Sequence, residues 1–415
     1  MKKYAIIGFG CAGYNGAKAL RAHAPDAAIH VFDNSGAPPF SPMLSTYHAA
    51  GKLPYEAVFP FGTLEDIAKE LKLDIIGETV VEVSAERTIT TDQATYENYD
   101  GILLATGADA LVPGFLTCTG EKWFLMRTLK DAQRLRSYLD THTVRTAAVV
   151  GGSMVGIKVA ELLHAAGVKV TIVDAAPYLF PLAAYRSTAE AIQSKLEEKG
   201  VAFAFDAKVS AIDEAGVTFA DGAKLEADLV CLCIGTRANV DVLRPSGVNI
   251  GRAVVVDEHM ESSVKGIYAA GDCCEGRNLQ TGKTAIIGLW ANAGAQGACA
   301  GANMAGVHTE YHGNILHNIT HFFDMDFIGL GDASVQGEHH RFEGKTFSIE
   351  LVMDAGQLKS VNIFGNYKIS GILKHHLTKQ LLGAESTLTP AQRGLLEQHG
   401  LPRDFIELIG GASHD

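Results

Sequence analysis

Two glycine-rich segments of the same pattern constrain this chain more than any other feature. Residues 8–13 read Gly-Phe-Gly-Cys-Ala-Gly, and residues 151–156 read Gly-Gly-Ser-Met-Val-Gly. Each follows an apolar run, and each is followed about 20 residues later by an acid, Asp33 or Asp174. A strand that turns sharply into a helix and brings its backbone close to a pyrophosphate needs glycine at these places. The sequence therefore predicts two dinucleotide sites in one chain.

Each glycine-rich segment lies inside a predicted strand–helix–strand unit. In the first, a strand at 3–7 precedes the loop, a helix runs to about Ala24, and a strand at 29–32 ends at Asp33. The second repeats this order, with strands at 147–150 and 168–173 around a helix that runs to Ala166. Ser153 stands where the first loop has Gly10. We expect so small a side chain to let the pyrophosphate approach.

Composition narrows the class of protein. A chain of 415 residues with 47% hydrophobic and 20% charged residues is typical of a soluble α/β enzyme of two or three domains. The formal net charge of −12 argues against nucleic acid as a partner. No signal sequence precedes the first strand, so we expect a cytoplasmic protein. Residues 285–307 lack charge but are rich in Gly, Ala, Asn and Gln, which predicts a buried helix rather than a membrane span.

The seven cysteines do not form a Cys-x-x-Cys pair, so we expect no metal site and no dithiol centre. Cys231 and Cys233 alternate along an apolar strand and are interpreted as core residues. The adjacent Cys273 and Cys274 are expected to be two reduced thiols, with a strained vicinal disulfide as the alternative.

The rest of the chain predicts further strands, and the pattern of predicted elements changes near Ile315. We expect a small antiparallel insert at 79–99, strands with tight turns at 201–234, and a strand at 266–272 that ends in an acid. Beyond Ile315 the pattern indicates a separate α+β domain. Its predicted strands are 321–330, 346–353 and 358–364, and its predicted helices are 369–382 and 390–399.

With these residues in place, the chain resembles the FAD-dependent pyridine nucleotide oxidoreductases, the group with rubredoxin and ferredoxin reductases, coenzyme A-disulfide reductase, NADH oxidases and the flavin portion of NADH-nitrite reductase. The resemblance covers residues 1 to about 310. Besides the two glycine-rich segments, it is carried by residues 105–107 (Ala-Thr-Gly), by 234–239 in the place of the family's Gly-x-x-Pro-Asn turn, and by 270–273 (Ala-Gly-Asp-Cys).

The resemblance implies an α/β fold with two Rossmann-like dinucleotide-binding domains and a C-terminal α+β interface domain, and it implies a homodimer. The implied FAD-binding domain is discontinuous, at 1–110 and 240–312. The NAD(P)H-binding domain would be 111–239, and the interface domain 313–415.

The resemblance also implies which residues hold the two cofactors. Asp33 would bind the adenosine ribose of FAD, and Asp272 the ribityl chain. The implied FAD-binding residues are Gly8, Gly10, Cys11, Ala12, Gly13, Asp33, Ser41, Val81, Ala105, Thr106, Gly107 and Asp272. The implied nicotinamide nucleotide-binding residues are Gly151, Gly152, Ser153, Met154, Val155, Gly156, Asp174 and Gly235.

Asp174 favours NADH over NADPH. A carboxylate accepts a hydrogen bond from a ribose 2′-hydroxyl but repels a 2′-phosphate, by roughly 4 kcal/mol at 4 Å and an effective dielectric of 20. If Asp174 only caps a turn, the preference would be weak.

Three departures from the family pattern bear on function. Residues 41–48 contain no cysteine where thiol-using relatives carry a redox cysteine, which disfavours disulfide, persulfide and four-electron oxidase chemistry. Lys158 stands where the family commonly has Glu; it could pair with Glu161 or act at the flavin. The cysteine spacing that an iron–sulfur cluster needs is absent, so a one-electron acceptor would be another protein.

The predicted activity is therefore hydride transfer from NADH to FAD, then electron transfer to a separate iron–sulfur or rubredoxin-type protein. Direct reduction of a small organic molecule or quinone is one alternative, and a flavin-binding sensor or assembly subunit is another. Lys158 and His48 are the candidate catalytic residues. His317 and His321 could approach a flavin from a partner subunit, although a structural role at an interface is the favoured interpretation.

Overall fold

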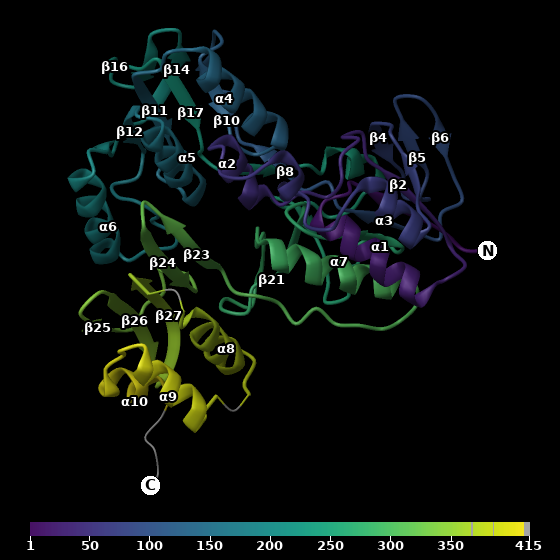
Figure 1. The fold of residues 1–415 in the computed structure, drawn as a ribbon. Coiled ribbons are helices and arrows are strands. Elements are labelled where there is room, and N and C mark those ends of the chain that lie inside the picture. Colours follow the sequence, from purple (N-terminus) through teal and green to yellow (C-terminus); the bar gives the residue numbers. More distant parts are fainter. Residues whose placement is uncertain (367, 385, 411–415) are drawn as a thin grey trace. The chain divides into compact units, whose positions relative to one another are not determined.

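The computed structural model describes residues 1–366, 368–384 and 386–410, and it divides into two compact units (Figure 1). The first unit contains Met1–Leu111, Arg127–Gln133 and Thr236–Asn314. The second contains Val112–Met126, Arg134–Gly235 and the chain from Ile315 onward. The first glycine-rich segment lies in the first unit, and the second segment lies in the second unit.

A five-stranded parallel sheet forms the centre of the first unit, in the order β20-β7-β1-β2-β3. The strands are β1 (Lys3–Ile7), β2 (Ala28–Phe32), β3 (Asp74–Ile76), β7 (Gly101–Leu104) and β20 (Ile267–Ala269). β1 and β7 are apolar along almost their whole length because the central strands of a parallel sheet are buried on both faces. The predicted strands at 3–7 and 29–32 are confirmed.

Helices α1 (Cys11–His23) and α7 (Trp290–Met304) pack closely on this sheet (Figure 1). A Cβ added at Gly297 would collide with the carbonyl oxygen of Ala12, and one at Gly301 with that of Gly16. The small residues of 285–307 therefore serve helix–helix packing, as expected of a buried helix. None of the described helices is both long and apolar enough to span a membrane.

Smaller elements complete the first unit. The predicted antiparallel insert is the three-stranded sheet β4 (Val80–Val83), β5 (Ile89–Thr91) and β6 (Thr95–Tyr96). A short helix, α2 (Pro42–Ala49), follows β2 along the chain. The others are the 3-10 helices at Tyr55–Val58 and Asp241–Ser246, α3 (Leu64–Leu71), β8 (Ala108–Ala110), β18 (Thr236–Ala238), β19 (Val254–Val255), β21 (Cys274–Arg277) and β22 (Thr284–Ala285).

The second unit repeats the parallel architecture around the second glycine-rich segment. Its five-stranded sheet has the order β10-β17-β11-β12-β13, and a four-stranded sheet has the order β16-β15-β14-β9. The strands are β9 (Thr117–Cys118), β10 (Trp123–Leu125), β11 (Thr146–Val150), β12 (Lys169–Val173), β13 (Ala202–Ala204), β14 (Val209–Asp213), β15 (Gly216–Phe219), β16 (Lys224–Glu226) and β17 (Leu229–Leu232). The helices are α4 (Leu129–Thr141), which begins in the first unit, α5 (Met154–Ala165) and α6 (Arg186–Glu198).

The chain beyond Ile315 forms an antiparallel five-stranded sheet in the order β23-β24-β27-β26-β25, followed by helices. The strand expected at 321–330 is interrupted, because Phe323 and Asp324 turn the chain with φ of 48° and 62° into a hairpin. The elements are β23 (His317–Phe322), β24 (Met325–Leu330), β25 (Glu338–Glu343), β26 (Ser348–Asp354), β27 (Gln357–Phe364), α8 (Ser370–Leu381), α9 (Pro390–Gln398) and α10 (Arg403–Gly410).

The predicted fold class, two Rossmann-like sheets and a C-terminal α+β part, is confirmed. The exact domain boundaries stay a prediction.

Candidate functional site

The first glycine loop joins β1 to α1 and is shaped by two of its glycines. Gly8 has φ of +90°, and a Cβ there would lie 2.6 Å from the carbonyl oxygen of Ala105. A Cβ at Gly13 would collide with the carbonyl oxygen of Gly8. Gly10 differs, because a Cβ there would meet no atom within 4 Å. The loop therefore folds tightly while leaving open space at the N-terminus of α1, and the residues present fit a bound pyrophosphate.

Asp33 holds this loop from the end of β2. Its carboxylate accepts a hydrogen bond from the backbone N–H of Phe9 at 2.8 Å and another from that of Ser35 at 2.9 Å. The acid thus lies beside the loop, where the sequence pattern places it. Its bond to a ribose stays a prediction.

The second glycine loop, between β11 and α5, has the same construction. Gly151 has φ of +111°, and a Cβ there would collide with the carbonyl oxygen of Cys233. A Cβ at Gly156 would collide with Gly151 in the same way. The hydroxyl of Ser153 donates to the carbonyl oxygen of Cys233 at 2.9 Å and accepts from the N–H of Gly156 at 3.1 Å. Ser153 therefore acts as the N-cap of α5.

Asp174 repeats the arrangement of Asp33. Its carboxylate accepts from the N–H of Gly152 at 2.6 Å and from that of Ala176 at 2.8 Å. Asp174 therefore caps the turn that follows it, which is the structural role that the sequence left open. Each carboxylate oxygen has further lone pairs, so this role is compatible with binding a ribose hydroxyl.

Met154 and Val155 begin α5 beside this loop, and Gly235 follows β17 with φ of +118° and open space at its Cβ position. These three residues lie in the second unit with the glycine loop. In the first unit, Cys11 and Ala12 form the first turn of α1.

Residues 105–107 close the other side of the first glycine loop. The N–H of Ala105 donates to the carbonyl oxygen of Ile7 at 2.8 Å. The hydroxyl of Thr106 donates to the carbonyl oxygen of Asn239 at 2.5 Å, and the N–H of Asn239 donates to that of Gly107 at 3.0 Å. The end of β7 is thus joined to the residues after β18.

Asp272 follows β20 and pairs with Arg127, a residue that the sequence reasoning missed. Arg127 Nη2 lies 2.7 Å from Asp272 Oδ2, with about one-fifth of each side chain exposed (23% and 18%). The Nε of Arg127 donates to the carbonyl oxygen of Ala108 at 2.7 Å. Because Arg127 is fixed at two points, it fixes the carboxylate that the resemblance assigns to the ribityl chain.

A local signal for Arg127 exists in the sequence. Thr128 and Asp131 form the start of α4: the N–H of Asp131 donates to the Thr128 hydroxyl at 3.1 Å, and the N–H groups of Arg127 and Thr128 donate to the Asp131 carboxylate at 3.1 and 2.7 Å. Such a capped helix start holds the preceding residue in one conformation. It does not indicate the partner, which lies 145 residues further along the chain.

Two predicted FAD-binding residues lie on elements other than the glycine loop. Ser41 is buried, and its N–H donates to the carbonyl oxygen of Val58 at 3.0 Å, at the start of α2. Val81 lies on β4 with 52% of its surface exposed. Their contact with FAD stays a prediction.

Both candidate catalytic residues have polar partners within the protein. In the first unit, His48 on α2 has its Nδ1 3.1 Å from the carbonyl oxygen of Leu53, and its ring lies edge-on to Tyr55. In the second unit, Lys158 forms an ion pair with Glu161, and its Nζ donates to the carbonyl oxygen of His321 at 2.8 Å. The pairing with Glu161 is the structural alternative named above; a flavin role for Lys158 and a catalytic role for His48 stay predictions.

The histidines of β23 have partners within the second unit. His317 Nε2 lies 3.3 Å from the Nζ of Lys374, and burial together with this cation lowers the pKa of His317 to about 4. His321 pairs with Asp326 at 2.8 Å.

All seven cysteines are free. Cys273 and Cys274 are buried, and their thiols donate to backbone carbonyl oxygens, so the reduced alternative is confirmed. Burial raises the pKa of both thiols, and it raises the pKa of Cys11 to about 11. Among the described residues, no group of three or more His, Cys, Asp or Glu side chains could hold a metal ion.

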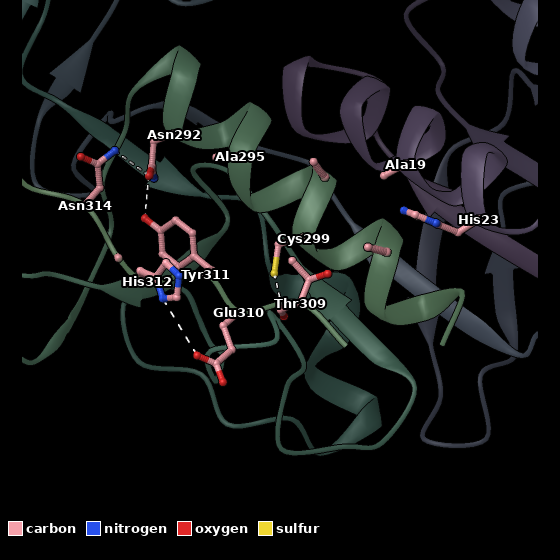
Figure 2. Close-up of a pocket in the computed structure, with 13 residues that line it drawn as sticks. Ala19, His23, Asn292, Ala295, Cys299, Thr309, Glu310, Tyr311, His312 and Asn314 are labelled. Atoms are coloured by element: carbon pink, nitrogen blue, oxygen red, sulfur yellow. Dashed lines mark hydrogen bonds and ion pairs between the residues drawn. The ribbon is translucent and has the colours of Figure 1, made fainter. Parts of the chain in front are cut away.

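A pocket of about 510 Å³ lies in the first unit, lined by α1, α7 and residues 309–314 (Figure 2). Figure 2 shows Tyr311 and Asn314 directed toward Asn292. The Tyr311 hydroxyl donates to Asn292 Oδ1 at 2.6 Å, and Asn314 Nδ2 donates to the same oxygen at 3.0 Å. The thirteen lining residues include none of the predicted site residues. We interpret this polar cluster as a structural link between α7 and residues 309–314.

Comparison with known proteins shows what the chain is similar to. The sequence profile described as pyridine nucleotide-disulphide oxidoreductase matches residues 2–297. An NADH oxidase of Methanocaldococcus jannaschii is 29% identical over 79% of this chain and 75% of its own length. A rubredoxin-NAD(+) reductase of Pseudomonas putida is 29% identical over 73% of this chain and 80% of its own length.

Another relative matches nearly the whole chain. The epsilon subunit of an NADH-dependent phenylglyoxylate dehydrogenase of Aromatoleum evansii is 28% identical over 94% of this chain and 93% of its own length. Among solved structures, the putidaredoxin reductase of a covalent complex with putidaredoxin superposes with a TM-score of 0.84 at 21% identity, over 96% of this chain and 99% of that one.

Proposed function

As a member of the pyridine nucleotide-disulphide oxidoreductase family the chain is an NAD(P)H-dependent FAD oxidoreductase, and we propose that it carries electrons between NADH and a separate iron–sulfur or rubredoxin-type protein. FAD, when bound, accepts the hydride of NADH and passes electrons on. The protein's own residues bind, orient and shield the two cofactors.

The proposal depends mainly on one observation, which is the lack of a redox thiol where thiol-using relatives carry one. Residues 41–48 hold no cysteine, and burial raises the pKa of thiols elsewhere in the chain, including Cys11, Cys233 and Cys299. Since the thiolate is the reactive form, these groups are poor nucleophiles at neutral pH. Electrons are therefore expected to leave from the flavin itself.

The described residues have defined parts in this proposal. The two glycine loops and the N-termini of α1 and α5 bind the two pyrophosphates. Asp33 and Asp174 bind the adenosine riboses, and the carboxylate of Asp174 favours NADH because it repels a 2′-phosphate. Arg127 orients Asp272 toward the ribityl chain of FAD.

The relatives support a protein acceptor. One is named a rubredoxin-NAD(+) reductase, and the solved complex joins a reductase of this fold to putidaredoxin. A second candidate is favoured by the match over nearly the whole chain, C-terminal part included, to a relative named as a subunit. In that case this chain is the NADH-linked subunit of a larger dehydrogenase, and its electron partner is another subunit.

Anaerobic stopped-flow measurements test the proposal. The protein is reduced with one equivalent of NADH and mixed separately with rubredoxin, a [2Fe–2S] ferredoxin, a ferredoxin with [4Fe–4S] clusters, a quinone and oxygen. We expect at least one of the iron or iron–sulfur proteins to reoxidise the flavin faster than quinone or oxygen does. Faster reoxidation by quinone or oxygen than by every protein would refute a protein acceptor. Purification of the protein from its own host distinguishes the second candidate, which requires co-purifying subunits.

A further inference from the structure

The loop that follows Asp174, residues 175–185, is fixed to the second glycine loop. Its Phe180 has φ of 55°, and the N–H of Phe180 donates to the carbonyl oxygen of Gly152 at 3.2 Å. Ala176 donates to Asp174 itself. We call residues 175–185 the acid loop. The acid loop is therefore hydrogen-bonded to both Asp174 and Gly152.

The C-terminal sheet holds the far end of the acid loop through one buried amide. Asn362 on β27 is 1% exposed. Its Nδ2 donates to the carbonyl oxygen of Ala183 at 2.9 Å, and its Oδ1 accepts from the N–H of Tyr185 at 2.7 Å. Only an amide side chain supplies a donor and an acceptor in this geometry, so Asn362 binds the loop backbone as a neighbouring strand would.

A second buried pair lies beside this amide. The hydroxyl of Tyr185 forms a hydrogen bond with that of Ser360, and these two residues are 5% and 0% exposed. Ser187, two residues after Tyr185, donates a hydrogen bond to the carboxylate of Glu350 on β26. Three side chains of the C-terminal sheet therefore bind the segment 183–187.

The packing around these bonds is close. A Cβ added at Gly329 on β24 would lie 2.6 Å from the carbonyl oxygen of Ala183. The ring of Phe180 stacks on that of Phe327, with centroids 5.7 Å apart and planes 19° apart. The acid loop thus has little freedom to shift while the C-terminal sheet is in place.

We propose that Asn362 and Ser360 are positioning residues of the NADH site, so that the C-terminal sheet sets the affinity for NADH by holding the acid loop. This inference rests on the proposed function, because it takes Asp174 and the second glycine loop as the NADH site. The Asn362 bonds satisfy the buried N–H of Tyr185 and the buried carbonyl oxygen of Ala183, and they hold the acid loop in the conformation in which it bonds Asp174 and Gly152.

The test compares Asn362→Leu, Asn362→Asp, Ser360→Ala and Tyr185→Phe in the FAD-loaded protein. Anaerobic stopped-flow gives the dissociation constant for NADH and the limiting rate of flavin reduction separately. Loss of one buried hydrogen bond corresponds to about a five-fold change in an equilibrium constant. Loss of both bonds of Asn362 corresponds to a larger change. We expect the dissociation constant for NADH to rise about five-fold in Ser360→Ala and at least that much in Asn362→Leu, with limiting rates and FAD content unchanged. Asn362→Asp keeps the acceptor for Tyr185 but places a buried carboxylate against the carbonyl oxygen of Ala183, so it should raise the dissociation constant for NADH at least as much as Asn362→Leu.

Two comparisons separate positioning from general damage. Ser360→Ala and Tyr185→Phe remove the same bond, so the double variant should be no weaker in NADH binding than either single variant. Tyr4→Phe is the matched control, because the Tyr4 hydroxyl is buried in the first unit without a hydrogen-bond partner in the described part of the chain. Its NADH constant should equal that of wild type.

Two results would decide against this account in different ways. If the variants lose thermal stability while the dissociation constant for NADH stays at the wild-type value, the inference fails and the proposed function stands. If NADH does not reduce the flavin of the wild-type protein at all, the proposed function itself fails.

Discussion

The carboxylate of Asp174 accepts a hydrogen bond from the backbone N–H of Gly152 at 2.6 Å. In the first unit Asp33 makes the equivalent bond with Phe9 at 2.8 Å. In both units one acid therefore fixes the glycine loop and remains available to a ribose. The repeated pattern of the sequence is repeated in three dimensions, down to this bond.

The first prediction concerns the choice of nicotinamide nucleotide. Asp174→Ala combined with Ala175→Arg removes the charge that repels a 2′-phosphate and adds one that attracts it. We expect the ratio of kcat/KM for NADPH to that for NADH to rise about 10- to 100-fold. Asp221→Asn, in a hairpin turn of the same unit, is the control and should leave the ratio unchanged. An unchanged ratio in the double variant would remove Asp174 from the NADH site.

The second prediction concerns Arg127. Arg127→Ala leaves the carboxylate of Asp272 without its partner in a place where four-fifths of the side chain is buried. We expect the affinity for FAD to fall by about 2 kcal/mol, or roughly 30-fold, which FAD-release titration measures. Arg136→Ala, which breaks the exposed pair with Asp140, should change it by less than about two-fold. Retention of full FAD affinity in Arg127→Ala would show that the pair does not serve the cofactor.

The third prediction decides between the two interpretations of Lys158. The Lys158–Glu161 pair is 13% and 15% exposed, so removal of either charge leaves the other nearly buried. Lys158→Met and Glu161→Gln should each lower the free energy of unfolding by about 2 kcal/mol, with a smaller combined loss than the sum. The flavin spectrum and midpoint potential should stay the same.

The matched control for Lys158 is the exposed Lys195–Glu198 pair, which has the same spacing on α6. Its removal should cost at most about 0.5 kcal/mol. A midpoint potential that changes in Lys158→Met but not in Glu161→Gln would instead favour a role of Lys158 at the flavin.

The fourth prediction concerns the contact between α1 and α7. Gly297→Ala places a methyl group against the carbonyl oxygen of Ala12, which lies in the first turn of α1 next to the glycine loop. We expect a loss of about 1–3 kcal/mol in the free energy of unfolding and weaker FAD binding, because the helix start must move. Gly394→Ala in α9 meets open space and should be neutral or stabilising by up to about 1 kcal/mol. Equal effects of the two substitutions in chemical denaturation would contradict the close packing.

Much of the fold and part of the site follow from local sequence. The glycine loops and their acids are recognisable because the turn itself demands Gly8, Gly13, Gly151 and Gly156. The C-terminal α+β character is likewise visible in its alternating strands. β25 escaped prediction because an edge strand with the sequence Glu-His-His-Arg-Phe-Glu lacks the alternation that burial of one face imposes.

The long-range contacts could not be predicted in this way. Arg127 and Asp272 are 145 residues apart, and Asn362 is 179 residues from Ala183. Neither Arg127 nor Asn362 stands out by type or spacing, since Arg is common on protein surfaces and Asn is common in exposed turns. Only the folded chain shows that Arg127 orients the carboxylate of Asp272 and that Asn362 binds the acid loop.

Anaerobic reduction of the purified FAD-loaded protein by NADH and, separately, by NADPH shows whether the two glycine loops hold FAD and NADH as proposed. Flavin absorbance is followed by stopped-flow at matched concentrations of the two nucleotides. We expect rapid bleaching by NADH and much slower bleaching by NADPH. Absence of bleaching by either nucleotide would contradict this proposal.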